Sequence, residues 1–225
     1  MNKRLEDWIN WILIDELKSG IINAPKHLLG NHDYGDGQVI MVYRPHAEKV
    51  CVVSPTGKNR DEMECLSDGV YGFYSAKKKY KGTKYRIETT YQDGTTVVTA
   101  DAYAFDSQIT DFDTYLFAEG KHYDVYEKFG AHPMTIDGVK GTYFAVWAPH
   151  ARRVSVVGDF NMWDGALNPM QMMQTSGIYE LFIPDVAPGA VYKYQILTRD
   201  GEILYKADPY GNQCQVRPDN ANVVA

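Results

Sequence analysis

Residues 141–165 read GTYFAVWAPHARRVSVVGDFNMWDG, and this stretch decides the fold class. Val154 and Val156 alternate with polar or small residues, which places apolar side chains on one face of a strand. Pro149 forces an extended backbone just before that strand, and Gly158 permits a bend at its end. The stretch therefore predicts two consecutive strands of a β-sheet protein, joined by a tight connection.

The same pattern occurs earlier in the chain. Residues 44–53, RPHAEKVCVV, line up with residues 148–157, APHARRVSVV. Three further pairs follow in the same order, with offsets between 104 and 109 residues: 68–71 with 176–179, 85–87 with 194–196, and 100–103 with 207–210. Ordered matches at a nearly constant offset indicate a duplicated domain.

Short runs rich in β-branched and aromatic residues, separated by turn residues, predict the remaining strands. They cover 38–43, 50–54, 69–76, 84–91 and 95–103 in the first copy, and 141–147, 154–159, 177–183, 191–198 and 202–206 in the second. Asp93-Gly94 and Asp200-Gly201 predict hairpin turns. We expect an all-β fold of two tandem immunoglobulin-like β-sandwiches, with an N-terminal helix and a short, partly helical connector. The expected domains are the helix at 1–20, the sandwiches at 21–105 and 131–225, and the connector at 106–130.

The first 19 residues have helical rather than strand periodicity. Apolar residues recur at helical spacing over residues 3–19, and Gly20 is a typical helix stop. Trp8 is interpreted as core packing of this helix, and Trp147 as packing inside the second sandwich. Residues 31–33, Asn-His-Asp, are expected to form a loop.

Composition excludes several classes of protein. The chain has 23 basic and 29 acidic residues, a net charge of −6, which argues against a nucleic-acid partner. Its three cysteines are widely spaced, and neither a metal site nor a cofactor motif is found. Acidic residues interrupt the N-terminal apolar stretch, and no run approaches the roughly 20 apolar residues of a membrane span. We expect a cytoplasmic protein with no membrane partner.

The most distinctive candidate for function is a single aromatic residue. Trp163 follows the strand that ends near Gly158, on a loop rich in turn-forming residues. A large flat indole on a surface loop can stack on the apolar face of a glucose ring, while neighbouring polar groups bind the hydroxyls. The alternative is that Trp163 packs against another protein domain.

The segment 131–225 resembles the family-48 carbohydrate-binding module. The motifs are residues 141–165, DVAPG at 185–189, YKY at 192–194 and KADPY at 206–210. Residues 122–132, HYDVYEKFGAH, resemble the tyrosine-rich entry to that module in 1,4-α-glucan (glycogen) branching enzymes. The first copy is similar to the extra N-terminal domain of the longer members of that family.

The resemblance implies two glucan-binding residues. Trp163 corresponds to the stacking tryptophan of the module, and Lys193 to a lysine that donates to sugar hydroxyls. The alternative for Lys193 is an ordinary solvated strand residue. Where some members have a second stacking tryptophan, this chain has Ile203, which implies weak or accessory binding.

The resemblance also implies chemistry that this chain does not carry. Branching enzymes place a carboxylate nucleophile and an acid on a (β/α)₈ barrel of about 250 residues, and no such motifs are found in 225 residues. We expect the non-catalytic front part of a branching enzyme, partnered by α-glucan and by the catalytic barrel domain of the same parent protein. The alternatives are a free-standing glycogen- or starch-binding module and the front part of a debranching enzyme.

Overall fold

The computed structural model describes residues 2–225, and its strands form four antiparallel sheets. The chain divides into two units. The first comprises the chain through Asp15 together with Lys26–Phe105, and the second comprises Glu16–Pro25 and Asp106–Ala225. The expected all-β fold is confirmed. The exact domain limits given above stay predictions.

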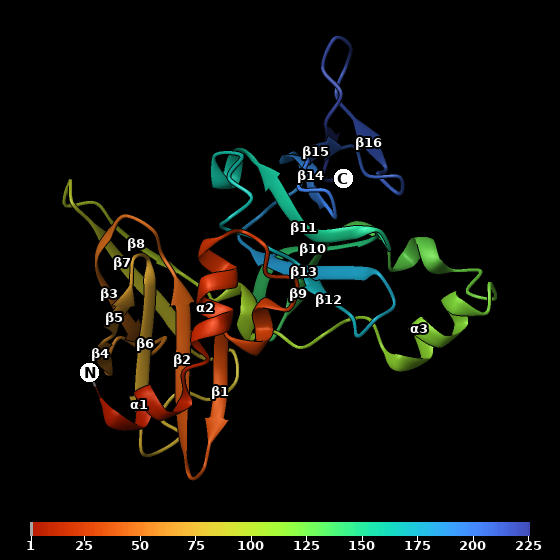
Figure 1. Cartoon of the computed structure of the whole chain (residues 1–225). Coiled ribbons are helices and arrows are strands. Elements are labelled where there is room, and N and C mark those ends of the chain that lie inside the picture. Colours follow the sequence, from red (N-terminus) through yellow and green to blue (C-terminus); the bar gives the residue numbers. More distant parts are fainter. Residues whose placement is uncertain (1) are drawn as a thin grey trace. The chain divides into compact units, whose positions relative to one another are not determined.

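The first unit contains two sheets of four strands (Figure 1). One sheet has the order β1-β2-β6-β5 and the other β4-β3-β7-β8. The strands are β1 (Gly30–Tyr34), β2 (Gly37–Tyr43), β3 (Ala47–Val53), β4 (Arg60–Glu62), β5 (Glu64–Ser67), β6 (Val70–Ser75), β7 (Arg86–Tyr91) and β8 (Thr96–Thr99). A buried cluster from both sheets, including Ile40, Val52 and Ile87, forms the core.

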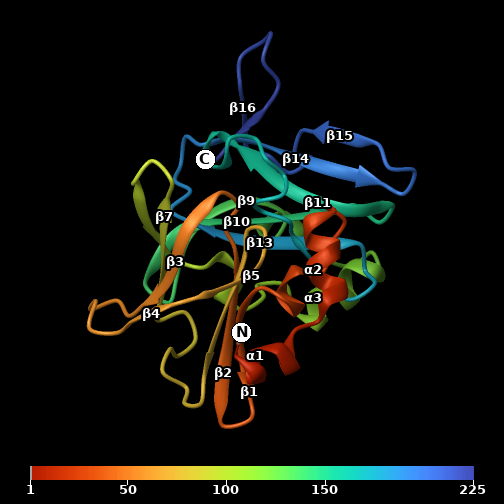
Figure 2. The same ribbon diagram turned by 60° about the vertical axis from the view of Figure 1, so that its left-hand side comes forward.

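The second unit also contains two sheets, one of four strands and one of five. One sheet has the order β12-β13-β10-β9, and the other β11-β14-β17-β16 with β15 also paired to β14. Figures 1 and 2 show β10 and β13 in one layer and β11 and β14 in the next. The strands are β9 (Gly130–Ile136), β10 (Val139–Trp147), β11 (Ala151–Gly158), β12 (Gln171–Met172), β13 (Ile178–Pro184), β14 (Val191–Thr198), β15 (Ile203–Lys206), β16 (Gln213–Cys214) and β17 (Asn222–Val223).

The strand registers confirm the duplication in detail. Val42 pairs with Tyr71 in the first unit, and Val146 pairs with Tyr179 at the equivalent place in the second. The equivalent strands β3 and β11 each carry a β-bulge after the first residue. The bulge lies between Ala47 and Lys49 in β3 and between Ala151 and Arg153 in β11. A shared bulge at the same position is expected of one ancestral sandwich copied within the chain.

One buried hydrogen bond recurs in both copies. Tyr85 donates its hydroxyl to Asp101 at 2.6 Å, and Tyr192 donates to Asp208 at 2.7 Å. Both aspartates are buried, and burial raises the pKa of each carboxyl. The structural equivalent of Tyr85 is therefore Tyr192, not Tyr194 as the sequence alignment placed it. The alignment was shifted by two residues because alternate strand positions carry similar residues.

The N-terminal helix is broken in two. The structure has α1 (Lys3–Trp8) and α2 (Trp11–Lys18) instead of the single helix expected over 3–19. The break lies at Asn10, whose side chain accepts from the backbone N–H of Ile12 at 3.1 Å. Asparagine side chains readily replace helical backbone hydrogen bonds in this way. Trp8 is half-buried and packs against His32, with 4.8 Å between ring centroids, in agreement with its packing role.

Two local expectations are wrong. Residues 31–33 lie within β1 and pair with β2, so they are not a loop. The polar side chains of these residues gave no sign of a strand in the sequence. The segment is a strand because its backbone pairs with the apolar β2. Trp147 is 50% exposed at the last position of β10, and its ring lies 5.5 Å from Phe117 instead of in the core.

The connector contains the helix α3 (Asp111–Ala118) and the short 3₁₀ turn η3 (Val125–Glu127). Thr110 and Asp113 cap the start of α3 reciprocally: each backbone N–H donates to the side chain of the other. Burial alone would raise the pKa of Asp113. Hydrogen bonds from Thr110 and His122 and the nearby charge of Lys128 outweigh burial and lower this pKa to about 2. No helix within residues 2–225 is both long and apolar enough to cross a bilayer.

The two copies of the Tyr–Asp bond predict unequal effects of the same substitution. Asp208 also accepts from Tyr194 at 3.0 Å, so Tyr192→Phe leaves it one phenol donor. We expect Tyr85→Phe to lower the free energy of unfolding by about 1–3 kcal/mol, and Tyr192→Phe by less. Urea unfolding of the two variants measures this, and a larger loss for Tyr192→Phe would contradict the account.

The capping of α3 predicts a pH-dependent contribution to stability. Because the folded pKa of Asp113 lies below its unfolded value, its stabilisation is present above about pH 4 and is lost as the pH falls toward about 2. We expect Asp113→Asn to cost about 1 kcal/mol at neutral pH and almost nothing near pH 2. Urea unfolding at several pH values checks this. Asp124→Asn is the control, since its side chain makes no capping hydrogen bond.

Candidate functional site

The loop that follows β11 is held by one buried side chain. Asn161 accepts from the backbone N–H of Gly158 at 2.9 Å and donates to the carbonyl of Val156 at 2.9 Å and to the side chain of Asn168 at 2.7 Å. These bonds connect the start, the middle and the far side of the loop. The loop is therefore a fixed structure, able to present a side chain in a defined position.

Trp163 occupies this loop in an unusual backbone conformation. Met162 and Trp163 are consecutive left-handed residues, with φ of 55° and 61°. Such positions cost about 1 kcal/mol or more for residues other than glycine and tend to occur where a site needs them. The half-buried indole donates its Nε1–H to Asp159 at 2.8 Å, so the orientation of the ring is fixed by a neighbour of the same loop.

Lys193 lies on β14, where it pairs with Val157 of β11. The backbone N–H of Trp163 donates to the carbonyl of Gly158, the next residue of β11, at 3.0 Å. Trp163 and Lys193 thus belong to the same end of the β11–β14 pair. The Nζ of Lys193 donates to the side-chain oxygen of Asn220. Lys193 is therefore held by the chain that returns from β16.

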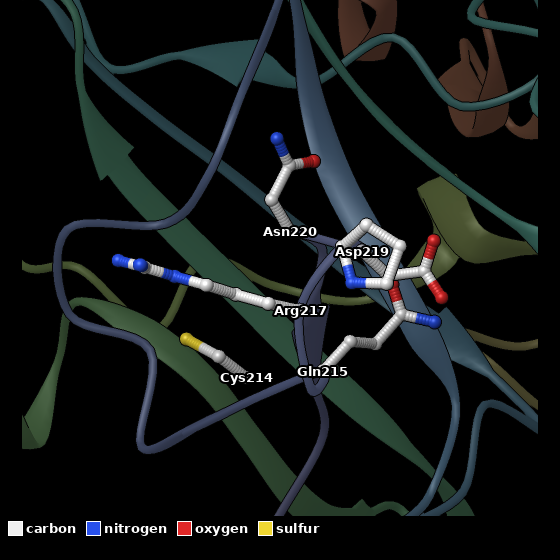
Figure 3. A pocket seen from close by; sticks show the side chains of 6 residues that line it. Cys214, Gln215, Arg217, Asp219 and Asn220 are labelled. Carbon is white, nitrogen blue, oxygen red and sulfur yellow. The ribbon is translucent and has the colours of Figure 1, made fainter.

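A hollow of about 380 Å³ adjoins this lysine contact. It is lined by Cys214 of β16 and by residues of the loop between β16 and β17: Gln215, Arg217, Pro218, Asp219 and Asn220. Figure 3 shows Arg217 and Cys214 on one side of the loop and Gln215 and Asp219 on the other. These amide, guanidinium and carboxylate groups can donate to and accept from hydroxyl groups. Sequence reasoning did not identify this loop, because its residues are ordinary polar types without a motif.

A second exposed aromatic residue was also missed. Tyr205 lies on β15 directly opposite Gln195 of β14 and is 51% exposed. Antiparallel partners point to the same face. Gln195 and Lys193 are two residues apart on β14, so Tyr205 lies on the face that carries Lys193. We call this surface, comprising Lys193, Tyr205 and Ile203 around the buried Gln195, the outer face. Ile203 is the position where some family members have a second stacking tryptophan. Tyr205 lies two residues further along the same strand, so its ring points to the same face, and the sequence could have revealed it by this spacing.

A buried cation lies under the outer face. Arg153 of β11 is 4% exposed, and its Nη2 donates to the side-chain oxygen of Gln195. Burial lowers the pKa of this guanidinium, and the negative charge of Asp164 acts in the opposite direction. Gln195 in turn donates to the hydroxyl of Tyr205 at 2.9 Å. Arg153, Gln195 and Tyr205 thus form a continuous chain of hydrogen bonds from the interior to the surface.

The part of the chain that the structure describes was searched for a metal centre. Within residues 2–225, no group of three or more histidine, cysteine, aspartate or glutamate side chains could hold a metal ion. What the outer face and the Trp163 loop offer is a flat indole, an exposed phenol, an ammonium group and several amides. Such a surface suits a neutral ligand rich in hydroxyl groups.

Comparison with known families gives two matches. Residues 10–103 match the family "alpha-1,4-glucan branching enzyme GlgB, N-terminal domain". Residues 128–211 match "Carbohydrate-binding module 48 (Isoamylase N-terminal domain)". Trp163, Lys193 and Tyr205 fall inside the second match.

A curated protein is similar over nearly the whole chain. The chain is 39% identical over 214 residues to the 1,4-alpha-glucan branching enzyme GlgB of Nitrosococcus oceani. The match covers 94% of this chain and 28% of that protein. The chain therefore spans just over a quarter of the length of this relative.

Solved structures with similarity include pullulanases. The enzyme of Anoxybacillus sp. LM18-11 is 17% identical with a TM-score of 0.35, over 87% of this chain and 28% of its own. The type I pullulanase of Bacillus subtilis is 13% identical with a TM-score of 0.37, over 87% of this chain and 26% of its own.

Proposed function

We propose that the chain is the glucan-positioning, non-catalytic N-terminal part of a 1,4-α-glucan branching enzyme, because it combines the two domains that the family models match. The parent protein would form α-1,6 branches in glycogen by transferring α-1,4-linked chains. The observation that carries this proposal is the 39% identity to a branching enzyme over 94% of the chain, across both modules in the same order.

The sheets of the chain support a non-catalytic role. A glycosyl-transferring site of this family needs carboxylates at the strand ends of a parallel barrel. The strands within residues 2–225 form four antiparallel sheets instead. The partners that we propose from the family matches are α-glucan, such as glycogen or amylose-like chains, and the catalytic barrel domain of the same parent protein.

The proposed glucan contact lies on the second module. Trp163 would stack on the apolar face of a glucose ring, because its indole is fixed by Asp159 on a rigid loop. Lys193 would donate to sugar hydroxyls from the outer face, next to the polar groups around Asn220. Tyr205 adds an exposed ring on the same face and partly replaces the second platform that is missing at Ile203.

The exposed aromatic residues of the connector support a protein partner for another part of this module. Phe112, Tyr115, Tyr123 and Tyr126 are each more than half exposed in the connector, and Trp147 is half exposed beside Phe117. Large exposed aromatic patches mark interaction surfaces. A barrel domain packed here would leave the Trp163 loop and the outer face to the glucan.

The stacking role of Trp163 predicts a loss of glycogen binding in Trp163→Ala. We expect the substitution to weaken retention by about 1–2 kcal/mol, roughly 5- to 30-fold in Kd, because stacking area is lost. Co-sedimentation with glycogen measures this. Trp11→Ala, which removes an exposed indole of α2, is the matched control and should bind normally. Unchanged retention of Trp163→Ala would favour the alternative, that Trp163 packs against another domain.

The non-catalytic assignment predicts no branching by the chain alone. We expect purified residues 1–225 to form no new α-1,6 linkages when incubated with amylose. Debranching with isoamylase followed by chain-length analysis detects such linkages, and the N. oceani branching enzyme serves as the positive control. New linkages above the blank would refute a purely glucan-positioning role.

A further inference from the structure

The two copies differ sharply at one equivalent position. The residue after the shared bulge is Lys49 in the first unit and Arg153 in the second. Lys49 is partly exposed and forms an ion pair with Glu62 at 2.6 Å. Arg153 is 4% exposed, and its hydrogen-bond acceptor is the neutral amide of Gln195. The same place in the fold thus holds a solvated ion pair in one copy and a desolvated cation in the other.

The guanidinium of Arg153 lies beside the end of α2. A side-chain carbon at Gly20 would lie 3.3 Å from Nη1 of Arg153, so the guanidinium fills the space next to this glycine. There Gly20 and Ile21 donate to the carbonyls of Leu17 and Glu16, which closes the last turn of the helix. Helix C-termini carry a partial negative charge that favours cations. Nε of Arg153, by contrast, finds no acceptor within residues 2–225.

Arg153 leaves the amide of Gln195 one orientation. A guanidinium can only donate, so the amide must turn its oxygen to Arg153 and its NH₂ group to Tyr205. Gly165 contacts the same amide: a side-chain carbon there would lie 2.0 Å from the amide oxygen. One side chain therefore touches the Trp163 loop and the Tyr205 hydroxyl at once.

The hydrogen bonds from Arg153 to Gln195 and from Gln195 to Tyr205 affect a group at the surface. Because Gln195 donates to the hydroxyl oxygen of Tyr205, the hydroxyl hydrogen of Tyr205 is left to donate to another acceptor. Tyr205 is half exposed and lies on the outer face with Lys193. A hydroxyl-rich ligand on this face would meet a phenol whose hydrogen can be donated to it.

We propose that Arg153 is a positioning residue for glucan binding, which acts through Gln195 to hold the Tyr205 ring and to turn its hydroxyl outward as a donor. This inference rests on the proposed function, because it assumes that the outer face binds α-glucan. Arg153 itself contacts no ligand. It sets the donor direction of a group that does.

Gln195→Glu tests the proposal by reversing one hydrogen bond. A glutamate still accepts from Arg153, but it also accepts from Tyr205, which turns the hydroxyl hydrogen inward. We expect glycogen affinity to fall about three- to tenfold, the size of one hydrogen bond, while the melting temperature is kept or raised. A variant that merely damaged the fold would lower both.

Tyr205→Phe and the first copy supply the controls. Tyr205→Phe should lower the affinity by a similar factor, and Gln195→Glu should have no further effect in that background, because the hydroxyl is already gone. Arg153→Met should also weaken binding, whereas Lys49→Met, the equivalent change in the first unit, should bind like the wild type. Affinity electrophoresis in gels containing glycogen measures the wild type and all five variants, including the double variant.

The outcomes separate the two proposals. If wild-type protein is not retarded by glycogen, the proposed function fails and this role fails with it. If wild-type protein binds and Gln195→Glu binds equally well, the positioning role alone is wrong. An equal loss for Gln195→Glu with and without the Tyr205 hydroxyl would also overturn it, whereas loss only in the presence of the hydroxyl supports it.

Discussion

The architecture depends on a carboxylate buried in each module and satisfied by a core tyrosine sixteen residues earlier in the chain. A desolvated carboxyl group is tolerated only where donors surround it. Asp101 and Asp208 each accept from a tyrosine hydroxyl and from a backbone N–H two residues on, so the bond fixes the turn after the last hairpin to the core. That turn lies against Gly30 and Gly130, both at left-handed φ, where a side chain would clash or crowd. The first strand of each sandwich is positioned by this contact.

Both copies of the duplicated domain keep this buried hydrogen bond, but the side chains that point outward from their sheets differ. The strand registers, the shared bulge and the Tyr–Asp bond are the same in both units, whereas the outward side chains differ. In the first unit the outward positions carry solvated ion pairs, such as Arg60 with Glu88. In the second unit the equivalent of Glu88 is Gln195, a neutral amide bonded to a buried arginine and an exposed tyrosine. A surface of amides and aromatic rings suits a neutral sugar better than a surface of ion pairs does.

Several features of the fold and of the candidate site were predictable because they depend on local patterns. The apolar alternation of β3 and β11 and the two Asp-Gly hairpins are such features, and Trp163 followed from its loop and its family motif. Other features depend on partners distant in the sequence. Polar residues 31–33 form a strand because β2 is apolar, and Trp147 is exposed because β10 extends to the sheet end. Tyr205 was overlooked for the same reason, since its role depends on pairing with Gln195.

The amino-acid sequence alone determined the fold class, the duplication and the family resemblance, because strand periodicity, turn residues and motif spacing are properties of neighbouring residues. The tertiary structure alone decided which groups share a surface and in which direction their hydrogen bonds point. Arg153 shows the difference most clearly. In the sequence it is one of two adjacent arginines before a strand. In the fold it is a buried cation between the end of a helix and an amide, because pairing of β11 with β14 places Gln195 within its reach and excludes water from both.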